Sequence, residues 1–306
     1  MDHFLAVADH SPEEIKGLLK KAIDLKKEFK EGGNKPILQG KALAMVFQKP
    51  SLRTRVSFEM GMQHLGGHAI YIGPSEIGLG QREAISDVAR VLAGYVDAVM
   101  ARVFAHEHVL ELAKWSDVPI INGLSDYNHP CQAISDALTI VEHYGMDSKG
   151  LNVSYVGDGN NVAVSLMHIS AKLGWNFTIG NPEGFDMPQA SVDVAKKLAE
   201  KSGSALNFSH SPEEAVADAD IVYTDTWVSM GQEEEQKRRE AVFPAFQVND
   251  TLLKNAKPTA MVMHCLPAHR GQEITDEVAD GKQSLLFPQA HNRMHAQKAV
   301  LAELMV

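Results

Sequence analysis

The stretch "ALAMVFQKPSLRTRVSFEMG", residues 42–61, decides the fold predicted for the first half of this chain of 306 residues. It starts with a short apolar run, reaches Pro50, and continues with apolar residues at helical spacing. Because a proline disfavours helix in the residue before it, the helix is predicted to begin at or just after Ser51. A strand followed at once by a helix is typical of a parallel α/β sheet.

The same rhythm recurs along the whole chain. Short apolar runs alternate with helix-like stretches, and near-continuous apolar strands are typical of parallel sheets that are covered on both faces. We therefore expect an α/β fold with two domains, each with a parallel β-sheet flanked by helices. The predicted strands begin at Ala42, His68, Asp97, Val118, Leu151, Trp175, Asp220 and Ala260.

Chain length also favours two domains, because 306 residues, 44% of them hydrophobic, exceed one typical core. Near the start, Ser11 and Glu14 form a capping-box pattern, which predicts a first helix running to about Phe29. A later helix-like stretch ends at Gly145, and the turn after it places the domain boundary near Ser148.

Charge and cysteine content exclude several classes of protein. Lys and Arg number 29 against 39 Asp and Glu, so broad nucleic-acid binding is not expected. Two cysteines far apart form no disulfide framework and suit a reducing compartment. The N-terminus lacks a signal-peptide pattern and no long apolar run predicts a membrane span, so we expect a cytoplasmic protein.

Glu235 precedes Arg239 by four residues, which predicts an exposed, ion-paired helix.

In open α/β sheets, ligands bind beyond the carboxyl ends of the strands, so polar residues there are site candidates. Ser51, Arg53, Thr54 and Arg55 follow the strand that begins at Ala42. A helix start offers free N–H groups and the positive end of the dipole, and guanidinium groups match phosphate oxygens. The segment therefore favours a phosphate site, and the alternative is a capped helix with two solvated arginines.

Two further strand ends carry single candidates. Arg102 by itself suggests a surface salt bridge. His129 lies three residues before Gln132 at a predicted helix start, which would place an imidazole and an amide on one side. A histidine that only caps the turn is the alternative at this position.

The segment "GDGNN", residues 157–161, begins like a dinucleotide-binding G-x-G motif. The third glycine is missing, since position 162 is Val, so a nicotinamide site and an NAD-dependent dehydrogenase are only weakly supported. The asparagines instead predict a polar clamp at a helix start.

Cys265 ends a buried-type strand and precedes a Leu-Pro pair. It is either a small buried hydrophobic residue or a nucleophile, and a nucleophile needs a base. His264 is adjacent but is predicted to point to the opposite side of the strand, so a covalent cysteine mechanism is not favoured. We find no His, Cys or carboxylate grouping with convincing metal spacing, so no metal site is predicted.

Five motifs, "SLRTR", "HPCQ", "DGNN", "DTWVSMG" and "HCLPAHRG", occur in one order along the chain. In this respect the chain resembles the ornithine carbamoyltransferases, within the aspartate/ornithine carbamoyltransferase superfamily. The resemblance implies a carbamoyl-phosphate-binding domain at residues 1–147 and an ornithine-binding domain at 148–290. Two interdomain helices would join them, the second at about 291–306 and packing back on the first domain. It also implies a homotrimer, with a higher assembly of trimers in some members.

The resemblance further implies roles for individual residues. Arg102, His129, Asp225 and Cys265 would be catalytic. Carbamoyl phosphate would be bound by Ser51, Leu52, Arg53, Thr54, Arg102, His129, Gln132, Cys265, Leu266 and Arg293. Ornithine would be bound by Asn161, Asp225, Ser229, Met230 and Cys265. Closure of the loop at Ser229, with Gly231 as a hinge, would exclude water.

The activity implied is transfer of the carbamoyl group from carbamoyl phosphate to the δ-amine of L-ornithine, giving L-citrulline and phosphate. No metal or organic cofactor is implied. A carbamoyltransferase for another amine, such as putrescine or N-acetylornithine, is the alternative. Gly78 stands where many members carry a Gln or His that reaches the neighbouring subunit's carbamoyl phosphate. Either Gln81 or another group substitutes there, or that contact is absent.

Overall fold

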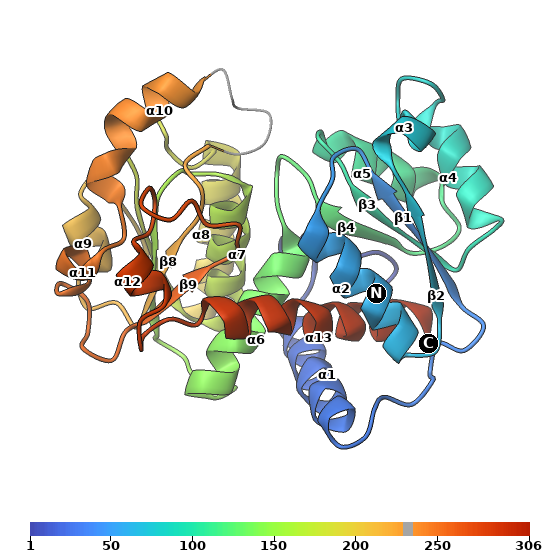
Figure 1. The fold of residues 1–306 in the computed structure, drawn as a ribbon, viewed down its shortest axis with the longest axis horizontal. Coiled ribbons are helices and arrows are strands. Elements are labelled where there is room, and N and C mark those ends of the chain that lie inside the picture. Colours follow the sequence, from blue (N-terminus) through green and yellow to red (C-terminus); the bar gives the residue numbers. More distant parts are fainter. Residues whose placement is uncertain (229–234) are drawn as a thin grey trace. The chain divides into compact units, whose positions relative to one another are not determined.

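The structure is a computed structural model that describes residues 1–228 and 235–306. The chain forms two compact units, the first made of Met1–Leu138 with His291–Val306 and the second of Thr139–Ala290. Each unit holds one sheet of parallel strands with helices alongside (Figure 1). The α/β class predicted from the sequence is confirmed. The functional domain limits at residues 147, 148 and 290 stay a prediction.

The sheet of the first unit has the strand order β2-β1-β3-β4. Parallel pairing aligns Phe47, the last residue of β1, with Arg102, the last residue of β3. The segments that leave these two neighbouring strands therefore start from the same edge of the sheet. The strands are β1 Ala42–Phe47, β2 His68–Ile72, β3 Ala98–Arg102 and β4 Ile120–Leu124.

Helix α1 shows how local sequence sets the elements of this unit. The Ser11 side chain accepts a hydrogen bond from Glu14 N, and Ser11 N donates to Glu14 Oε2, so the predicted capping box is confirmed. Chain segments far apart in sequence complete the unit. Its helices are η1 Val7–Asp9, α1 Pro12–Lys30, α2 Leu52–His64, α3 Pro74–Ile77, α4 Ile85–Ala93, α5 His106–Trp115 and most of α13 Leu286–Met305. Helix α6, Pro130–Tyr144, continues past residue 138 into the second unit.

The sheet of the second unit has the order β7-β6-β5-β8-β9. Four of these strands match predicted ones, and β7 was not predicted. It is a short edge strand, "LNFS", that pairs only with β6 and leaves its middle residues exposed, so it lacks the apolar run of an interior strand. The strands are β5 Asn152–Val156, β6 Asn176–Gly180, β7 Leu206–Ser209, β8 Ile221–Thr224 and β9 Met261–His264.

Helix α7 lies in the interior of the second unit, since every residue from Val162 to Leu173 is buried. A helix that is buried on all sides needs neighbours all round, and these include β6 and the adjoining α8. The remaining helices are shorter and lie after the strands. The helices of this unit are α7 Asn161–Leu173, α8 Gln189–Ser202, α9 Pro212–Val216, α10 Gln236–Val242, η3 Phe243–Phe246, α11 Asp250–Leu253 and α12 Asp276–Ala279.

Within the described ranges, the helices are all too short or too polar to cross a lipid bilayer.

Candidate functional site

The N-terminus of α2 is exposed at the carboxyl end of β1. Ser51 is the N-cap, and its side chain accepts a hydrogen bond from Thr54 N at 3.3 Å. The helix thus begins where the proline was predicted to allow it. Leu52, the first helical residue, is exposed. The first turn presents N–H groups that have no partner inside the helix, together with the positive end of the helix dipole.

Two guanidinium groups meet at the hydroxyl of Thr54. Arg102 Nη1 donates to Thr54 Oγ1 at 3.3 Å, and Arg293 Nη2 donates to the same atom at 3.4 Å. All three side chains are buried, and Arg102 is only 6% exposed. The surface salt bridge expected for Arg102 from its local sequence is therefore wrong. Its strand, β3, lies between β1 and β4, so its last side chain is enclosed by the segments that leave those two neighbouring strands.

Gln132 is held in one orientation between two partners. Its Nε2 donates to Asp136 Oδ1 at 2.7 Å, one turn further along α6. Its Oε1 accepts from Arg293 Nη1 at 2.6 Å. Arg293 belongs to α13, yet it bonds to Thr54, which follows β1, and to Gln132, which follows β4. The resemblance implied that Arg293 would reach back to these residues. The amide therefore keeps its own Nε2 group turned away from the guanidinium.

His129 is buried among positive charges. Burial holds the pKa of its imidazole well below the usual range, and the charges of Arg293, Arg102, Lys49 and Arg53 lower it further. The ring is consequently neutral at physiological pH. It can donate one N–H to an anionic or carbonyl oxygen without bringing a further charge into the cluster.

Lys49 is a residue of this cluster that sequence reasoning missed. It is half-buried, and burial together with the charge of Arg102 lowers the pKa of its ammonium to about 8, while Asp126 opposes this shift. Its ammonium lies 5.0 Å from the centre of the Phe104 ring. Its place directly before Pro50, in the turn between strand and helix, was the available signal.

Arg55 differs from Arg53 in its surroundings. It is exposed, lies 4.1 Å from the centre of the Tyr71 ring, and its Nε is 3.4 Å from Glu59 Oε2 on the same helix. These are surface contacts, and they set Arg55 apart from the buried arginines at Thr54.

In the second unit, the side chain of Asp225 follows β8 and is held from two sides. Cys265 Sγ, after β9, donates to Asp225 Oδ1 at 3.1 Å. Asn160 Nδ2, after β5, donates to Asp225 Oδ2 at 3.0 Å. Three adjacent strands of one sheet thus bring a thiol, a carboxylate and an amide together at its carboxyl edge.

Asn160 is a residue of this cluster that the predicted site did not include. Its Oδ1 caps α7 by accepting from Val162 N at 2.9 Å and Ala163 N at 3.1 Å, which confirms the predicted polar clamp. Its Nδ2 is the group bonded to Asp225. Asn161 is instead the first residue of α7 and is half-buried. The ligand role predicted for Asn161 stays a prediction.

His264, the last residue of β9, has its Nε2 3.0 Å from Glu273 Oε1. The expectation that no metal-like grouping exists needs correction, however. One ligand atom each from Asp225, His264 and Cys265 lies within 4.8 Å of the others. Both imidazole nitrogens already take part in hydrogen bonds, with Leu266 N and with Glu273. A cation here would have to displace one of them.

Arg239 is a second residue that was missed. It is 4% exposed, and its Nη1 donates to Asp158 Oδ2 at 2.7 Å and to Trp227 O at 2.8 Å. The predicted pair with Glu235 exists at 3.0 Å, but the expected exposed position of Arg239 is wrong. The guanidinium connects the segment after β5 with the segment after β8.

Gly78 has a structural reason to be glycine. It ends α3 in the left-handed conformation, with φ +48°. A Cβ atom added there would lie 2.8 Å from Arg82 Cβ. The Gln or His that the resemblance implies at this position would therefore strain this particular turn. Gln81, the suggested substitute, is exposed.

Three residues that sequence reasoning assigned lie outside the described ranges. These are Ser229 and Met230, predicted to bind ornithine, and Gly231, predicted to act as a hinge.

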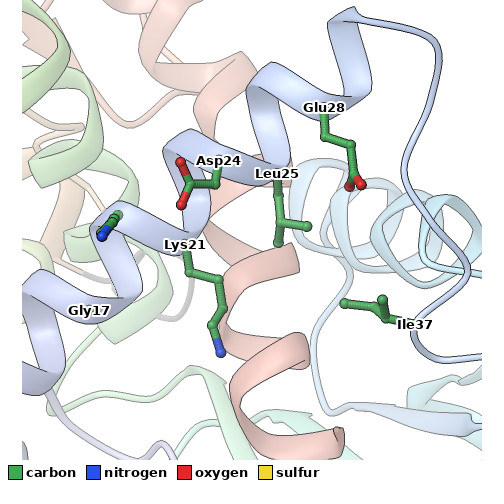
Figure 2. A pocket seen from close by; sticks show the side chains of 7 residues that line it. Gly17, Lys21, Asp24, Leu25, Glu28 and Ile37 are labelled. Atoms are coloured by element: carbon green, nitrogen blue, oxygen red, sulfur yellow. The ribbon is translucent and has the colours of Figure 1, made fainter.

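A hollow of about 430 Å³ on the first unit lies away from all these motifs (Figure 2). It is lined along α1 and the segment after it by acidic, basic and apolar residues, and it contains no residue of a strand-end motif. We assign it no role in the site. Its lining residues are Gly17, Lys20, Lys21, Asp24, Leu25, Glu28 and Ile37.

The fold and the two clusters define a class: a two-unit α/β protein with buried arginines gathered at a helix start in one unit and a carboxylate–thiol pair at the sheet edge of the other. The chain belongs to the aspartate/ornithine carbamoyltransferase family. The family's carbamoyl-P binding domain matches residues 2–142, and its Asp/Orn binding domain matches residues 149–304.

Similar proteins cover nearly the whole chain. An ornithine carbamoyltransferase of Anoxybacillus flavithermus is 51% identical over 302 residues, which are 99% of this chain and 96% of that protein. An anabolic ornithine carbamoyltransferase of Pyrococcus furiosus is 52% identical over 301 residues, 98% of this chain and 95% of that one. The solved structure of ornithine carbamoyltransferase from Pyrococcus furiosus superposes with a TM-score of 0.96, covering 99% of this chain and 96% of that chain.

Proposed function

We propose that this chain is an ornithine carbamoyltransferase, which transfers the carbamoyl group of carbamoyl phosphate to the δ-amine of L-ornithine and releases L-citrulline and phosphate. Within metabolism this is a step of arginine biosynthesis. The observation that carries the proposal is the meeting of Arg102 and Arg293 at Thr54, beside the start of α2. Buried guanidinium groups at a helix N-terminus suit a small dianion such as a phosphate ester.

The phosphate group would be bound by the first turn of α2, with Ser51, Leu52, Arg53 and Thr54. Arginine forks and backbone N–H groups stabilise the negative charge that grows on phosphate as it leaves. His129 and Gln132 would hold the carbamoyl end, with Cys265 and Leu266 beside it.

The carbonyl oxygen gains negative charge when the amine attacks the carbamoyl carbon. Arg102, Thr54 and the neutral imidazole of His129 would donate to that oxygen from fixed positions. Removing one such preorganised donor typically costs about 3–4 kcal/mol of transition-state stabilisation. Because Arg102 and Thr54 are already bonded to each other, these two donors need little rearrangement during the reaction.

The amine must be neutral to attack. Asp225 would bind the α-amino group of ornithine, with Asn161, Ser229 and Met230 completing the contacts to the amino-acid end. Cys265 would position the δ-amine, and the partly desolvated surroundings would lower the pKa of that amine. The hydrogen bond from the Cys265 thiol to Asp225 supports a positioning role over that of a thiolate nucleophile.

An assay of the purified protein tests this proposal. With carbamoyl phosphate present, ornithine should yield citrulline and phosphate in equal amounts. Putrescine and N-acetylornithine, offered in the same panel, should react far more slowly, because putrescine lacks the α-carboxylate and N-acetylornithine lacks a free α-amino group for Asp225. If one of these amines reacts faster than ornithine, that amine and not ornithine is the carbamoyl acceptor.

A further inference from the structure

One buried carboxylate, Glu273, holds both ends of the segment that follows β9. Glu273 is 0% exposed, and its Oε1 accepts from His269 N at 2.6 Å. The same oxygen lies 3.0 Å from His264 Nε2, at the last residue of the strand. The residues between these two anchors include Cys265 and Leu266, which carry the predicted contacts to the reacting groups.

The surroundings of His264 determine which ring nitrogen carries the proton. Leu266 N donates to His264 Nδ1 at 2.9 Å, so Nδ1 is an acceptor and holds no proton. The proton of the neutral ring is therefore on Nε2, from which it is donated to Glu273. The backbone N–H of His264 is also occupied, since it donates to Gln289 Oε1 at 2.9 Å.

Leu266 needs such support because of its backbone conformation. Its φ is +58°, in the left-handed region that a residue with a Cβ atom rarely adopts. A residue held in such a conformation persists only where its surroundings over-determine it. The hydrogen bond from Leu266 N to the His264 ring restrains Leu266. The hydrogen bond from that ring to Glu273 in turn restrains the ring.

Cys265 lies between the restrained strand end and the restrained Leu266. Its thiol donates to Asp225 Oδ1 at 3.1 Å, a distance that holds only if the backbone on both sides stays in place. Loss of the carboxylate would free the His264 ring and the N–H of His269 together. It would thereby loosen the thiol without touching any substrate contact.

We propose that Glu273 is a positioning residue for carbamoyl transfer, which fixes Cys265 and Leu266 by accepting hydrogen bonds from the His264 ring and from His269 N. The role in turnover rests on the proposed function. The restraint on the thiol does not, and it can be measured without any turnover.

The test compares Glu273→Ala and Glu273→Gln with Glu277→Gln, a matched change of an exposed carboxylate on α12. Labelling of Cys265 by a small thiol reagent, on folded protein, should be about tenfold faster in Glu273→Ala, the factor for losing one charge-assisted hydrogen bond. Buried Cys131 serves as the internal standard. Glu273→Gln keeps an acceptor oxygen and should stay near the wild-type rate.

Turnover gives the second readout. In Glu273→Ala, kcat should fall by about 10- to 100-fold, as expected for a misplaced reacting group, while the KM for carbamoyl phosphate changes little. Glu273→Gln should recover most of kcat. If Glu273→Ala does not fold, His264→Gln tests the restraint on Leu266, because its amide can still donate to Glu273 while the ring nitrogen that accepts from Leu266 N is lost.

Labelling and kcat in Glu273→Ala equal to those of Glu277→Gln would overturn the inference. So would a Glu273→Gln variant as impaired as Glu273→Ala, since an acceptor oxygen would then be insufficient. A wild-type protein that does not carbamoylate ornithine contradicts the proposed function alone, because the labelling comparison still reports on the restraint.

Discussion

Single residues divide the charge at the start of α2 into two roles. Arg53 lies in the first turn beside Thr54 and contributes to the positive surroundings of His129, whereas Arg55 contacts Tyr71 and Glu59 at the surface. The residues are only two positions apart, but a helix turns by about 200° over that interval, so they face different partners.

Arg53→Ala should therefore reduce turnover with carbamoyl phosphate by roughly 100- to 1,000-fold, the loss expected for one charged donor. Arg55→Ala should change the free energy of unfolding by about 1 kcal/mol or less and leave turnover near normal. Steady-state kinetics and thermal unfolding of both variants check this division. Equal loss of carbamoyl-phosphate affinity, with folding intact, would show that it is wrong.

His129 predicts a pH effect on stability. Its pKa in the folded protein is depressed by burial and then by Arg293, so the unfolded state takes up the proton first as pH falls. The stability contributed by keeping this ring neutral is present above the unfolded pKa of about 6.5 and is lost below it.

Wild type should accordingly lose stability relative to His129→Gln as pH falls from about 7.5 to 5.5, by up to about 1.4 kcal/mol per pH unit below 6.5. Denaturant unfolding at several pH values measures the difference. His143→Gln, at an exposed ring, is the control. Parallel curves for wild type and His129→Gln would refute the assignment.

Among the elements, α10 is coupled to the second sheet by one buried ion pair. Arg239 joins Asp158 after β5 and the carbonyl of Trp227 after β8. Burial raises the pKa of Asp158, and the nearby guanidinium works against that rise. The helix could be predicted from its charge spacing, but not the inward direction of Arg239, because the partner lies 81 residues away in sequence.

Arg239→Ala should lower the free energy of unfolding by about 3–5 kcal/mol, because it leaves the buried carboxylate of Asp158 without its charged partner. A double variant that also carries Asp158→Asn should recover part of this loss. Glu235→Gln, which removes only the exposed partner of Arg239, should cost under about 1 kcal/mol. If Arg239→Ala lowers the free energy of unfolding by no more than Glu235→Gln does, this account is wrong.

For the whole molecule, we expect three chains to assemble, as the family resemblance implies. Light scattering of the purified protein should give three times the 33.5 kDa of one chain, or a multiple of that trimer. Gly78, in its left-handed turn, offers no side chain for the cross-subunit contact that the resemblance implies. A monomer with full activity would contradict an assembly that completes the site.

The sequence by itself determined the elements and the motifs, because these depend on near neighbours. Apolar runs located eight of the nine strands described, the capping box located α1, and Pro50 located the start of α2. All of these signals act over a few residues along the chain. The edge strand β7 was not predicted, because it pairs with one strand only and is too exposed to need an apolar run.

Only the tertiary structure decided which side chains meet. Arg293 reaches Thr54 across 239 residues and Gln132 across 161, Asn160 contacts Asp225 across 65, and Arg102 is buried instead of exposed. The physical reason is that burial and hydrogen-bond geometry depend on which strands are neighbours in a sheet and on how helices turn their faces. Parallel strands bring together residues from distant parts of the chain, and the order of strands in a sheet cannot be predicted from the spacing of residues along the sequence.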